Sequence, residues 1–263
     1  MLRTSGTKLL AAALTVVLAG VCLADGYLIH GRRPAAAPPG GPPYSDDFST
    51  DPFASRWTVD QAGGGGSITW QSGTSDVDLQ VAAVAEDALM RYNTALDTVE
   101  QCVCGTIAYV DGSSQGSFGA ALRGGSDFAS GYLILAAAYH AAGASTASAY
   151  ISVESGGAWS CDVAHATISA TASYTVCVQI SGTGAWNDGA SGTKLRMWVD
   201  PASADCTGTP DVGYTDWTND SGSGCLSAGV TSSTDTQKYV GWGTQEYGAV
   251  STHTLDDWYA DDM

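Results

Sequence analysis

Short apolar segments with a period of two dominate the chain from about residue 45 onward. In each segment Val, Ile, Leu, Tyr, Thr or Trp alternates with polar or small residues, and Gly, Ser, Asp and Asn separate one segment from the next. They cover residues 67–71, 77–84, 105–110, 117–123, 131–140, 148–154, 174–180, 194–200 and 238–244. This alternation predicts strands with one buried face. Residues 81–91 ("VAAVAEDALMR") also fit a short helix.

Many short strands without long helical patterns or internal repeats predict an all-β fold of two packed sheets. The chain has 263 residues and is 44% hydrophobic, which suffices for one large domain with a packed core. We therefore expect residues 45–263 to form a two-sheet antiparallel β-sandwich.

The residues before this domain have a different composition. Residues 1–24 carry Arg3 and Lys8, then an apolar run, then small residues up to Ala24, which is the order of a secretory signal. The run has about 16 residues and a spanning helix prefers roughly 20, so we expect no stable membrane span. Residues 25–44, rich in Pro, Ala and Gly, predict a flexible linker. We expect an extracellular or cell-surface protein; a retained leader would instead indicate assembly inside a cell, as in a virion.

Acidic side chains outnumber basic ones by 27 to 10, which gives a net charge of -17. Such a chain repels polyanions, so we expect neither a nucleic acid nor an anionic lipid surface as a partner. The same acidity suits solubility and the binding of divalent cations.

The cysteines predict disulfides. Seven are present, and six remain once a leader containing Cys22 is removed, an even number that is typical of exported domains. Cys206 and Cys225 flank a polar loop, and we predict that they pair. Three pairings stay open for the other four, which are Cys102, Cys104, Cys161 and Cys177.

The alternation also assigns the cysteines to a face. Val103 and Ile107 share one face of their strand, which places Cys102 and Cys104 on the other. We therefore expect disulfides on the outer face of a sheet. A zinc site is not expected, because Cys-x-Cys is a weak metal signal and no second pair stands at finger spacing.

Four segments have a familiar order along the chain. They are "DDFSTDPFASRWT" (46–58), "GSFGAALRGGSDFASGYLIL" (116–135), "SYTVCVQISGTGAWNDGASGTKLRMWVDP" (173–201) and "THTLDDWYADD" (252–262). In pattern and order they resemble the concanavalin A-like lectin/glucanase superfamily, in particular its laminin-G-like jelly-roll domains. The resemblance spans nearly all of residues 45–263. It implies a jelly roll of two antiparallel sheets, with the first and last strands side by side.

Paired aspartates stand near both ends of this domain. If the terminal strands are neighbours, Asp46 or Asp47 lies near Asp256 or Asp257, and like charges at that range need a cation or water between them. Many relatives hold a structural calcium near their ends, so the resemblance implies calcium at these four aspartates. The alternative is strand-edge charges that discourage edge pairing. Alternation assigns one face to Leu255, Asp257 and Tyr259, and the other to Asp256 and Trp258.

No enzyme motif is evident. Retaining glycanases of this fold carry a Glu-x-Asp-x-x-Glu strand, and none of Glu86, Glu100, Glu154 and Glu246 begins one. Residues 112–116 ("GSSQG") match a nucleophile elbow, but strands expected on both sides favour a hairpin turn. His140, His165 and His253 are expected to be ordinary strand or loop residues. We therefore expect no enzymatic activity, with a hydrolase or lyase of atypical site as an alternative.

Sugar binding is the function that the remaining features favour. Aromatic rings beside amides and carboxylates commonly hold sugars, and two loops carry that mixture. The candidate residues are Trp186, Asn187, Asp188, Tyr214, Trp217 and Asn219. We predict a secreted, non-catalytic carbohydrate-binding or adhesive module whose partner is a polysaccharide or glycan. The first alternative is a self-associating structural subunit of an extracellular assembly, filament or virion.

Overall fold

The structure is a computed structural model of the chain. It describes residues 43–62, 66–81, 87–109, 116–128, 133–140, 146–155, 158–169, 173–182, 194–211, 236–246 and 251–263. The expected leader and all but the end of the linker fall outside these ranges, so both segments stay predictions. Within these ranges there is no helix with the length and apolar character needed to cross a membrane.

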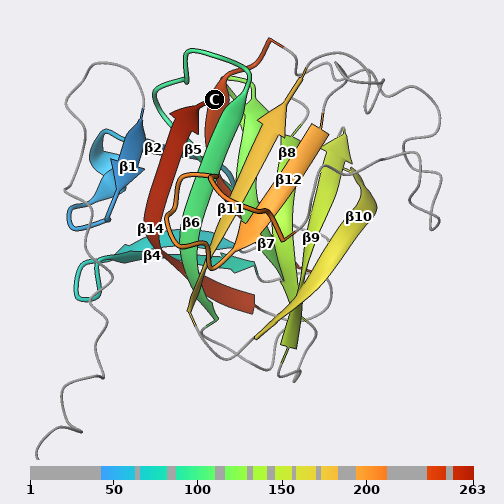
Figure 1. Ribbon diagram of the computed structural model, residues 1–263. Helices are drawn as coiled ribbons and strands as arrows, with labels where there is room; N and C mark the ends of the chain where they lie inside the picture. Colours follow the sequence, from blue (N-terminus) through green and yellow to red (C-terminus); the bar gives the residue numbers. More distant parts are fainter. Residues whose placement is uncertain are drawn as a thin grey trace, which may run out of the picture. The chain divides into compact units, whose positions relative to one another are not determined.

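The described strands form two antiparallel sheets that lie face to face (Figure 1). Sheet A has the spatial order β12 (Lys194–Val199), β11 (Tyr174–Ser181), β6 (Gln101–Tyr109), β14 (Ser251–Asp262), β4 (Asp76–Val81) and β3 (Ser67–Gln71), with β1 (Tyr44–Asp46) paired to β14. Sheet B has the order β10 (Ala158–Ser169), β9 (Thr146–Ser155), β8 (Leu133–His140), β7 (Gly116–Gly124), β13 (Tyr239–Glu246), β5 (Asp87–Tyr92) and β2 (Trp57–Ala62). A short 3-10 helix, η1 (Pro52–Ala54), precedes β2.

The prediction of an all-β, two-sheet antiparallel sandwich is confirmed, and each of the alternating segments contributes a strand. The helical alternative for residues 81–91 is wrong where the structure describes them, since β5 begins at Asp87. Residues 112–115 of the predicted hairpin turn lie outside the described residues; strands flank them as expected, but β6 belongs to sheet A and β7 to sheet B, and the two do not pair with each other.

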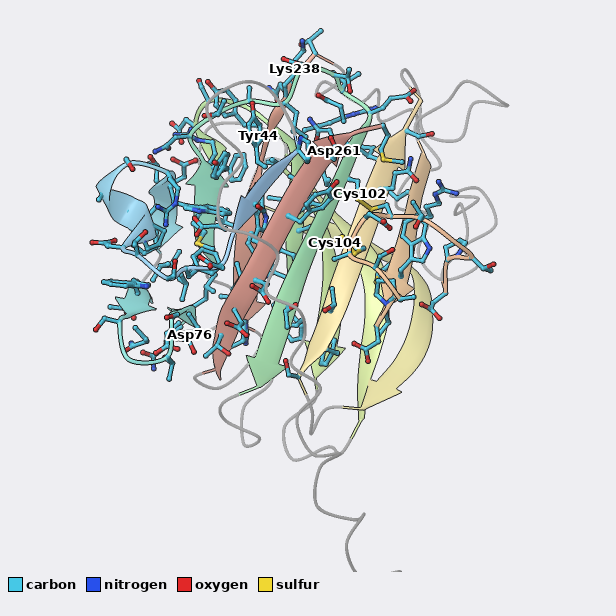
Figure 2. All side chains as sticks on the ribbon, turned by 60° about the vertical axis from the view of Figure 1, so that its left-hand side comes forward. Tyr44, Asp76, Cys102, Cys104, Lys238 and Asp261 are labelled. Atoms are coloured by element: carbon cyan, nitrogen blue, oxygen red, sulfur yellow. A yellow bond between two sulfur atoms is a disulfide. The ribbon has the colours of Figure 1, made fainter. Side chains whose placement is uncertain are left out.

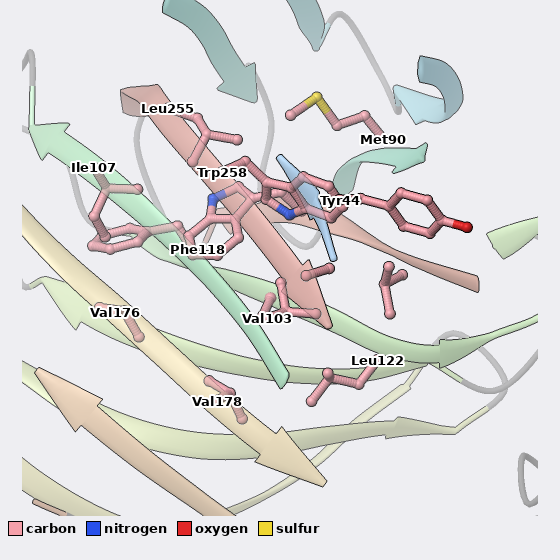
Figure 3. Close-up of a cluster of buried hydrophobic side chains, with 14 of the residues drawn as sticks. Tyr44, Met90, Val103, Ile107, Phe118, Leu122, Val176, Val178, Leu255 and Trp258 are labelled. Atoms are coloured by element: carbon pink, nitrogen blue, oxygen red, sulfur yellow. The ribbon is translucent and has the colours of Figure 1, made fainter. Parts of the chain in front are cut away.

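The main core lies between the sheets and takes residues from both (Figure 3). Sheet A contributes Val103, Ile107, Val176, Val178, Leu255 and Trp258, and sheet B contributes Met90, Phe118, Leu122, Val240 and Trp242. Gly105 of β6 faces this core, and a Cβ there would stand 2.7 Å from the Trp242 ring. Glycine is therefore required for the indole to lie against β6.

The first and last strands lie side by side, as the family resemblance implies. Tyr44 pairs with Ala260 and Asp46 with Trp258. A β-bulge interrupts the pairing of β14 with β6 between Leu255 and Asp257. The extra residue reverses the alternation, so Leu255 and Trp258 both join the main core. The predicted assignment of these two residues to opposite faces is therefore wrong.

Cys102, Cys104 and Cys177 lie on the outer face of sheet A, as predicted. Cys104 is bonded to Cys177 on the neighbouring strand, and Cys102 is bonded to Cys206. The predicted Cys206–Cys225 pair is therefore wrong. Residues 200–211 fold back over the outer face of sheet A, which brings Cys206 to Cys102 although 104 residues separate them in sequence.

Candidate functional site

The first candidate site is the predicted calcium group, which consists of Asp46, Asp47, Asp256 and Asp257. The Asp46 carboxylate is buried and ion-paired with Arg56, whose Nε lies 2.7 Å from Oδ2. Its Oδ2 also accepts a hydrogen bond from Trp57 Nε1 at 2.8 Å, and its Oδ1 accepts one from the Phe48 amide at 2.9 Å. Asp46 therefore acts as an internal counter-ion that joins β1 to the start of β2.

The other three aspartates of this group lie apart from that network. Asp47 Oδ1 accepts a hydrogen bond from the Ser49 amide at 3.1 Å, Asp256 is the exposed residue of the β14 bulge, and Asp257 pairs with Thr106. Among the described residues, one group of at least three His, Cys, Asp or Glu side chains has its ligand atoms within 4.8 Å of one another, and it consists of cysteines. The four aspartates are not brought together as a set of ion ligands, and calcium stays a prediction.

The last acids of the chain hold a loop in place. Asp262 accepts hydrogen bonds from the Thr98 amide at 2.7 Å, from the Thr98 hydroxyl at 2.8 Å and from the Asp97 amide at 3.1 Å. Tyr259 donates its hydroxyl hydrogen bond to Asp261 at 2.7 Å. Figure 2 places Tyr44 and Asp261 at this same end of sheet A. The acids at both ends of the domain thus fix neighbouring backbone, which is a structural role.

Aromatic rings pack around the Asp46 network. Tyr92 stacks on Trp258 with ring centroids 4.9 Å apart, and Trp57 meets Trp258 edge-on at 4.7 Å. Burial raises the pKa of Tyr92, and the negative charge of Asp46 raises it further. Burial also raises the pKa of Tyr44, with smaller contributions from Asp97 and Asp262.

These shifts predict alkaline destabilisation. A tyrosine whose folded pKa lies above its unfolded value near 10 contributes stability that is complete below about pH 10 and is lost as the pH rises through the folded pKa. We expect the free energy of unfolding, measured with urea at several pH values, to fall above about pH 10. Tyr92→Phe should make that fall shallower. An identical pH dependence in Tyr92→Phe and the original chain would contradict this assignment.

The second candidate is the outer face of sheet B, where the described side chains belong to β2, β5, β7, β13 and Phe128. Leu89, Ala121 and Phe128 form a small buried cluster there. The Phe128 ring lies against Gly241, where a Cβ would stand 2.9 Å from it. Beside this cluster Arg91 is ion-paired with Asp60 at 2.7 Å, and its guanidinium lies 5.0 Å from the centre of the Tyr239 ring. This end of the face is packed and electrostatically balanced.

The register extends this face to the far side of the sheet. One row of directly paired residues runs from Leu89 through Gly243, Gly119, Ala137 and Tyr150 to His165. A second row runs from Arg91 through Gly241, Ala121, Leu135 and Ser152 to Asp162. Because paired residues share a face, the outer-face positions across the middle of the sheet carry Gly, Ala and Leu.

Polar and aromatic residues gather where these rows end. Tyr150, Ser152 and Glu154 occupy alternate positions of β9, and Glu154 pairs with Trp159 of β10. The intervening positions of β9 include Ala149 and Val153. Through β8 they are in register with Phe118 and Leu122, which belong to the core, so they are core-facing positions. By register, the outer-face positions of β9 and β10 include Tyr150, Glu154, Trp159, Asp162 and His165.

Sequence reasoning did not identify this second group. The alternation in 148–154 was visible, but the sequence does not show that β9 and β10 pair or which parity faces the core. The register of β10 is also shifted twice, between Trp159 and Asp162 and between Asp162 and His165, which hides its period. The predicted sugar-binding residues, Trp186, Asn187, Asp188, Tyr214, Trp217 and Asn219, lie outside the described residues.

Comparison with known proteins relates the fold to solved structures. Neither a protein-family model nor a curated protein matches the chain. A xylan β-1,4-xylosidase from Bacillus halodurans C-125 matches 86% of the chain with a TM-score of 0.54 and 12% identity. An engineered GH43 glycoside hydrolase matches 87% with a TM-score of 0.54 and 10% identity. The chain covers only 40% and 42% of these two proteins. A Crh5 transglycosylase matches 87% of the chain and 88% of its own length, with a TM-score of 0.50 and 11% identity.

These matches correct the expectation that the domain is not an enzyme. That expectation came from the missing Glu-x-Asp-x-x-Glu strand. The solved structures that resemble this fold include two glycoside hydrolases and a transglycosylase, so the missing motif does not exclude activity. At this identity the likeness shows the fold and does not assign a reaction.

Proposed function

We propose that the domain is a carbohydrate-active β-sandwich that binds a polysaccharide on the outer face of sheet B, over β9 and β10. The observation that supports this proposal is the register of β8, β9 and β10, in which Tyr150, Trp159, His165, Glu154 and Asp162 occupy outer-face positions. Aromatic rings stack on the apolar faces of sugars, and carboxylates and imidazoles bind their hydroxyl groups. The directly paired positions of β8 are Ala137, Leu135 and Leu133.

The solved structures support this proposal at the level of the fold. Enzymes named as a xylosidase, a glycoside hydrolase and a transglycosylase share the arrangement of strands. The same proposal includes export from the cell, because a secreted sandwich meets polysaccharides outside the cell. It also includes membership of the concanavalin A-like superfamily. The six loop residues predicted from the sequence stay candidates for further sugar contacts.

Cleavage of the bound glycan is the second candidate function. Glu154 of β9 and Asp162 of β10 occupy nearby positions on neighbouring strands of one face. Glycoside hydrolysis uses two carboxyl groups, with one protonating the leaving oxygen and the other acting as nucleophile or base. Glu154 is paired with Trp159 and Asp162 with Ser152, so the two acids are diagonal neighbours across a register shift. Diagonal positions stand about 7 to 8 Å apart, which is within the range of carboxyl pairs in inverting glycosidases.

The test is depletion of the full chain by a panel of insoluble polysaccharides, with released reducing sugar assayed in the same tubes. We expect depletion by at least one polysaccharide, and Tyr150→Ala should weaken binding roughly three- to tenfold because a stacking ring is lost. Glu154→Gln should change binding little, because the amide can still hydrogen-bond sugar hydroxyls, and should lower any sugar release by about a hundredfold or more. Asp256→Asn, on the exposed bulge of sheet A, is the matched control and should change neither.

Other results would have definite meanings. If Tyr150→Ala is depleted as strongly as the original chain, the binding site does not lie on this face. Trp186→Ala and Trp217→Ala would then test whether the loops bind the polysaccharide. Loss of binding on chelation would support calcium. Failure to bind any polysaccharide, together with concentration-dependent self-association in sedimentation, would favour the structural assembly.

A further inference from the structure

Two cysteines of the domain remain once the disulfides of sheet A are assigned. Those disulfides use four of the seven cysteines in the chain, and the expected leader contains Cys22. Cys161 and Cys225 are therefore the remaining pair. The bond between Cys102 and Cys206 also removes the partner that the sequence suggested for Cys225. An exported domain with an even number of cysteines typically pairs all of them.

We propose that Cys161 of β10 and Cys225 form a third disulfide. Cys225 belongs to the segment 212–235, which is outside the described residues, and the bond attaches that segment to the end strand of sheet B. The same strand borders the face proposed to bind polysaccharide. The bond itself does not depend on sugar binding, so it can be tested without a sugar.

The strand that carries Cys161 has irregular pairing. Among the described strands, β10 pairs with β9 alone, and its register shifts between Trp159 and Asp162. Ser160 and Cys161 together stand opposite the single residue Val153, which makes this position a β-bulge. A bulge interrupts the ladder of backbone hydrogen bonds, and an edge strand has a ladder on one side only. A cross-link at Cys161 therefore restrains a part of the sheet that its own pairing holds weakly.

The described chain ends close to this strand before the segment 212–235 begins. Asp211 accepts a hydrogen bond from the Val199 amide at 2.7 Å, which places it beside β12 at the end of sheet A. β12 contacts β9, the neighbour of β10 (Figure 1). Because packed sheets are about 10 Å apart and adjacent strands about 4.8 Å apart, the path from β12 to Cys161 is on the order of 20 Å. Roughly 14 residues lead from Asp211 to Cys225 and can span up to about 45 Å, which is ample.

The segment is also long enough to return to the sheet from β10. The described chain resumes at Thr236, directly before β13, which is four strands away from β10 in sheet B. At about 4.8 Å per strand, the distance across the sheet is about 19 Å. Roughly 11 residues lead from Cys225 to Thr236 and can span up to about 35 Å. A bond at Cys161 is therefore compatible with both ends of the segment.

Formation of the bond needs an oxidant, which is an organic disulfide of the compartment that receives the exported chain. The thiolate of one cysteine attacks that disulfide and releases one of its two thiols, and the second cysteine then attacks the mixed disulfide and releases the other. Two electrons and the two cysteine protons thus pass to the oxidant, which becomes a pair of thiols. This step rests on the proposed function in one respect, because export supplies the oxidising compartment.

The experiment is a disulfide map of the full chain, isolated after secretion, alkylated without reduction and digested with chymotrypsin. Cleavage after aromatic residues separates Cys161 from Cys177 and Cys225 from Cys206. We expect mass spectrometry to find Cys161 and Cys225 on one cross-linked pair of peptides, which a reductant divides into two. The map reports the bond directly and is independent of the polysaccharide assay, so the two proposals fail separately.

Two variants sharpen the assignment. Cys161→Ser should leave one alkylated thiol per chain, at Cys225, and should leave the peptides of the other two disulfides cross-linked. Ser160→Ala, in the same bulge, is the matched control and should leave no alkylated thiol. The proposal is overturned if Cys161 and Cys225 of the original chain are both alkylated, if either is joined to a different cysteine, or if a non-reducing gel shows that the bond links two chains.

Discussion

Asp46→Ala is expected to lower the free energy of unfolding by about 3 to 5 kcal/mol. The substitution removes the buried partner of Arg56, whose side chain is only 27% exposed. It also leaves Trp57 Nε1 and the Phe48 amide without their acceptor. Donor groups that were hydrogen-bonded to Asp46 then stay buried without an acceptor. Leaving them unpaired costs more free energy than their hydrogen bonds contribute. Urea denaturation followed by tryptophan fluorescence measures the loss.

Asp47→Ala is the matched control for that prediction. Asp47 is the next residue along the chain. It carries the same side chain as Asp46 but is only half-buried. Its loss should cost less than about 1 kcal/mol, as for most surface positions. Equal losses in the two variants, or losses that disappear when a chelator is present, would instead favour the calcium site that the sequence predicted.

The period of two was sufficient to predict the strands and the core. Alternation depends only on local geometry, so segments such as 174–180 predict both a strand and its buried side, with Val176 and Val178 facing the core and Cys177 facing away. The strand tryptophans Trp57, Trp198, Trp242 and Trp258 are buried as well, and Trp70 is partly buried.

Features that depend on contacts between distant segments could not be predicted in the same way. A bulge in β14 changes which residues face the core, and nothing within "LDDWYADD" shows that an extra residue is inserted opposite Ile107 and Thr106. The partner of Cys206 depends on a loop that folds back over a sheet, and the nearest cysteine in sequence was the wrong choice. Pairing across a sheet is set by the whole topology.

The candidate sugar site illustrates the same division. The residue types of β9 were legible from the sequence, because Tyr150 and Glu154 alternate with Ala149 and Val153. Their importance comes from the neighbours that the register supplies, which are Ala137 and Leu133 of β8 on one side and β10 on the other. Sequence reasoning instead weighted acidic pairs, and Asp46 and Asp262 prove to fix neighbouring segments of the fold.

Removing either disulfide is expected to cost about 3 to 4 kcal/mol of unfolding free energy. The sequence separations are 104 and 73 residues, but each bond shortens the ring that the other closes. With one bond in place, the other closes a ring of only roughly 30 residues. That ring consists of the short segment from Cys102 to Cys104 and the segment from Cys177 to Cys206. Cys102→Ala/Cys206→Ala and Cys104→Ala/Cys177→Ala should therefore lose similar stability in urea denaturation, and each serves as the matched control of the other.

Replacing all four cysteines removes both rings, and the expected loss rises to about 8 kcal/mol. That loss is comparable to the whole stability of an ordinary domain, about 5 to 15 kcal/mol, so the variant should be marginally folded. Adding a phosphine reductant to the original chain should bring its stability down toward that of the variant. A loss below about 1 kcal/mol for Cys102→Ala/Cys206→Ala alone would contradict this ring-closure account.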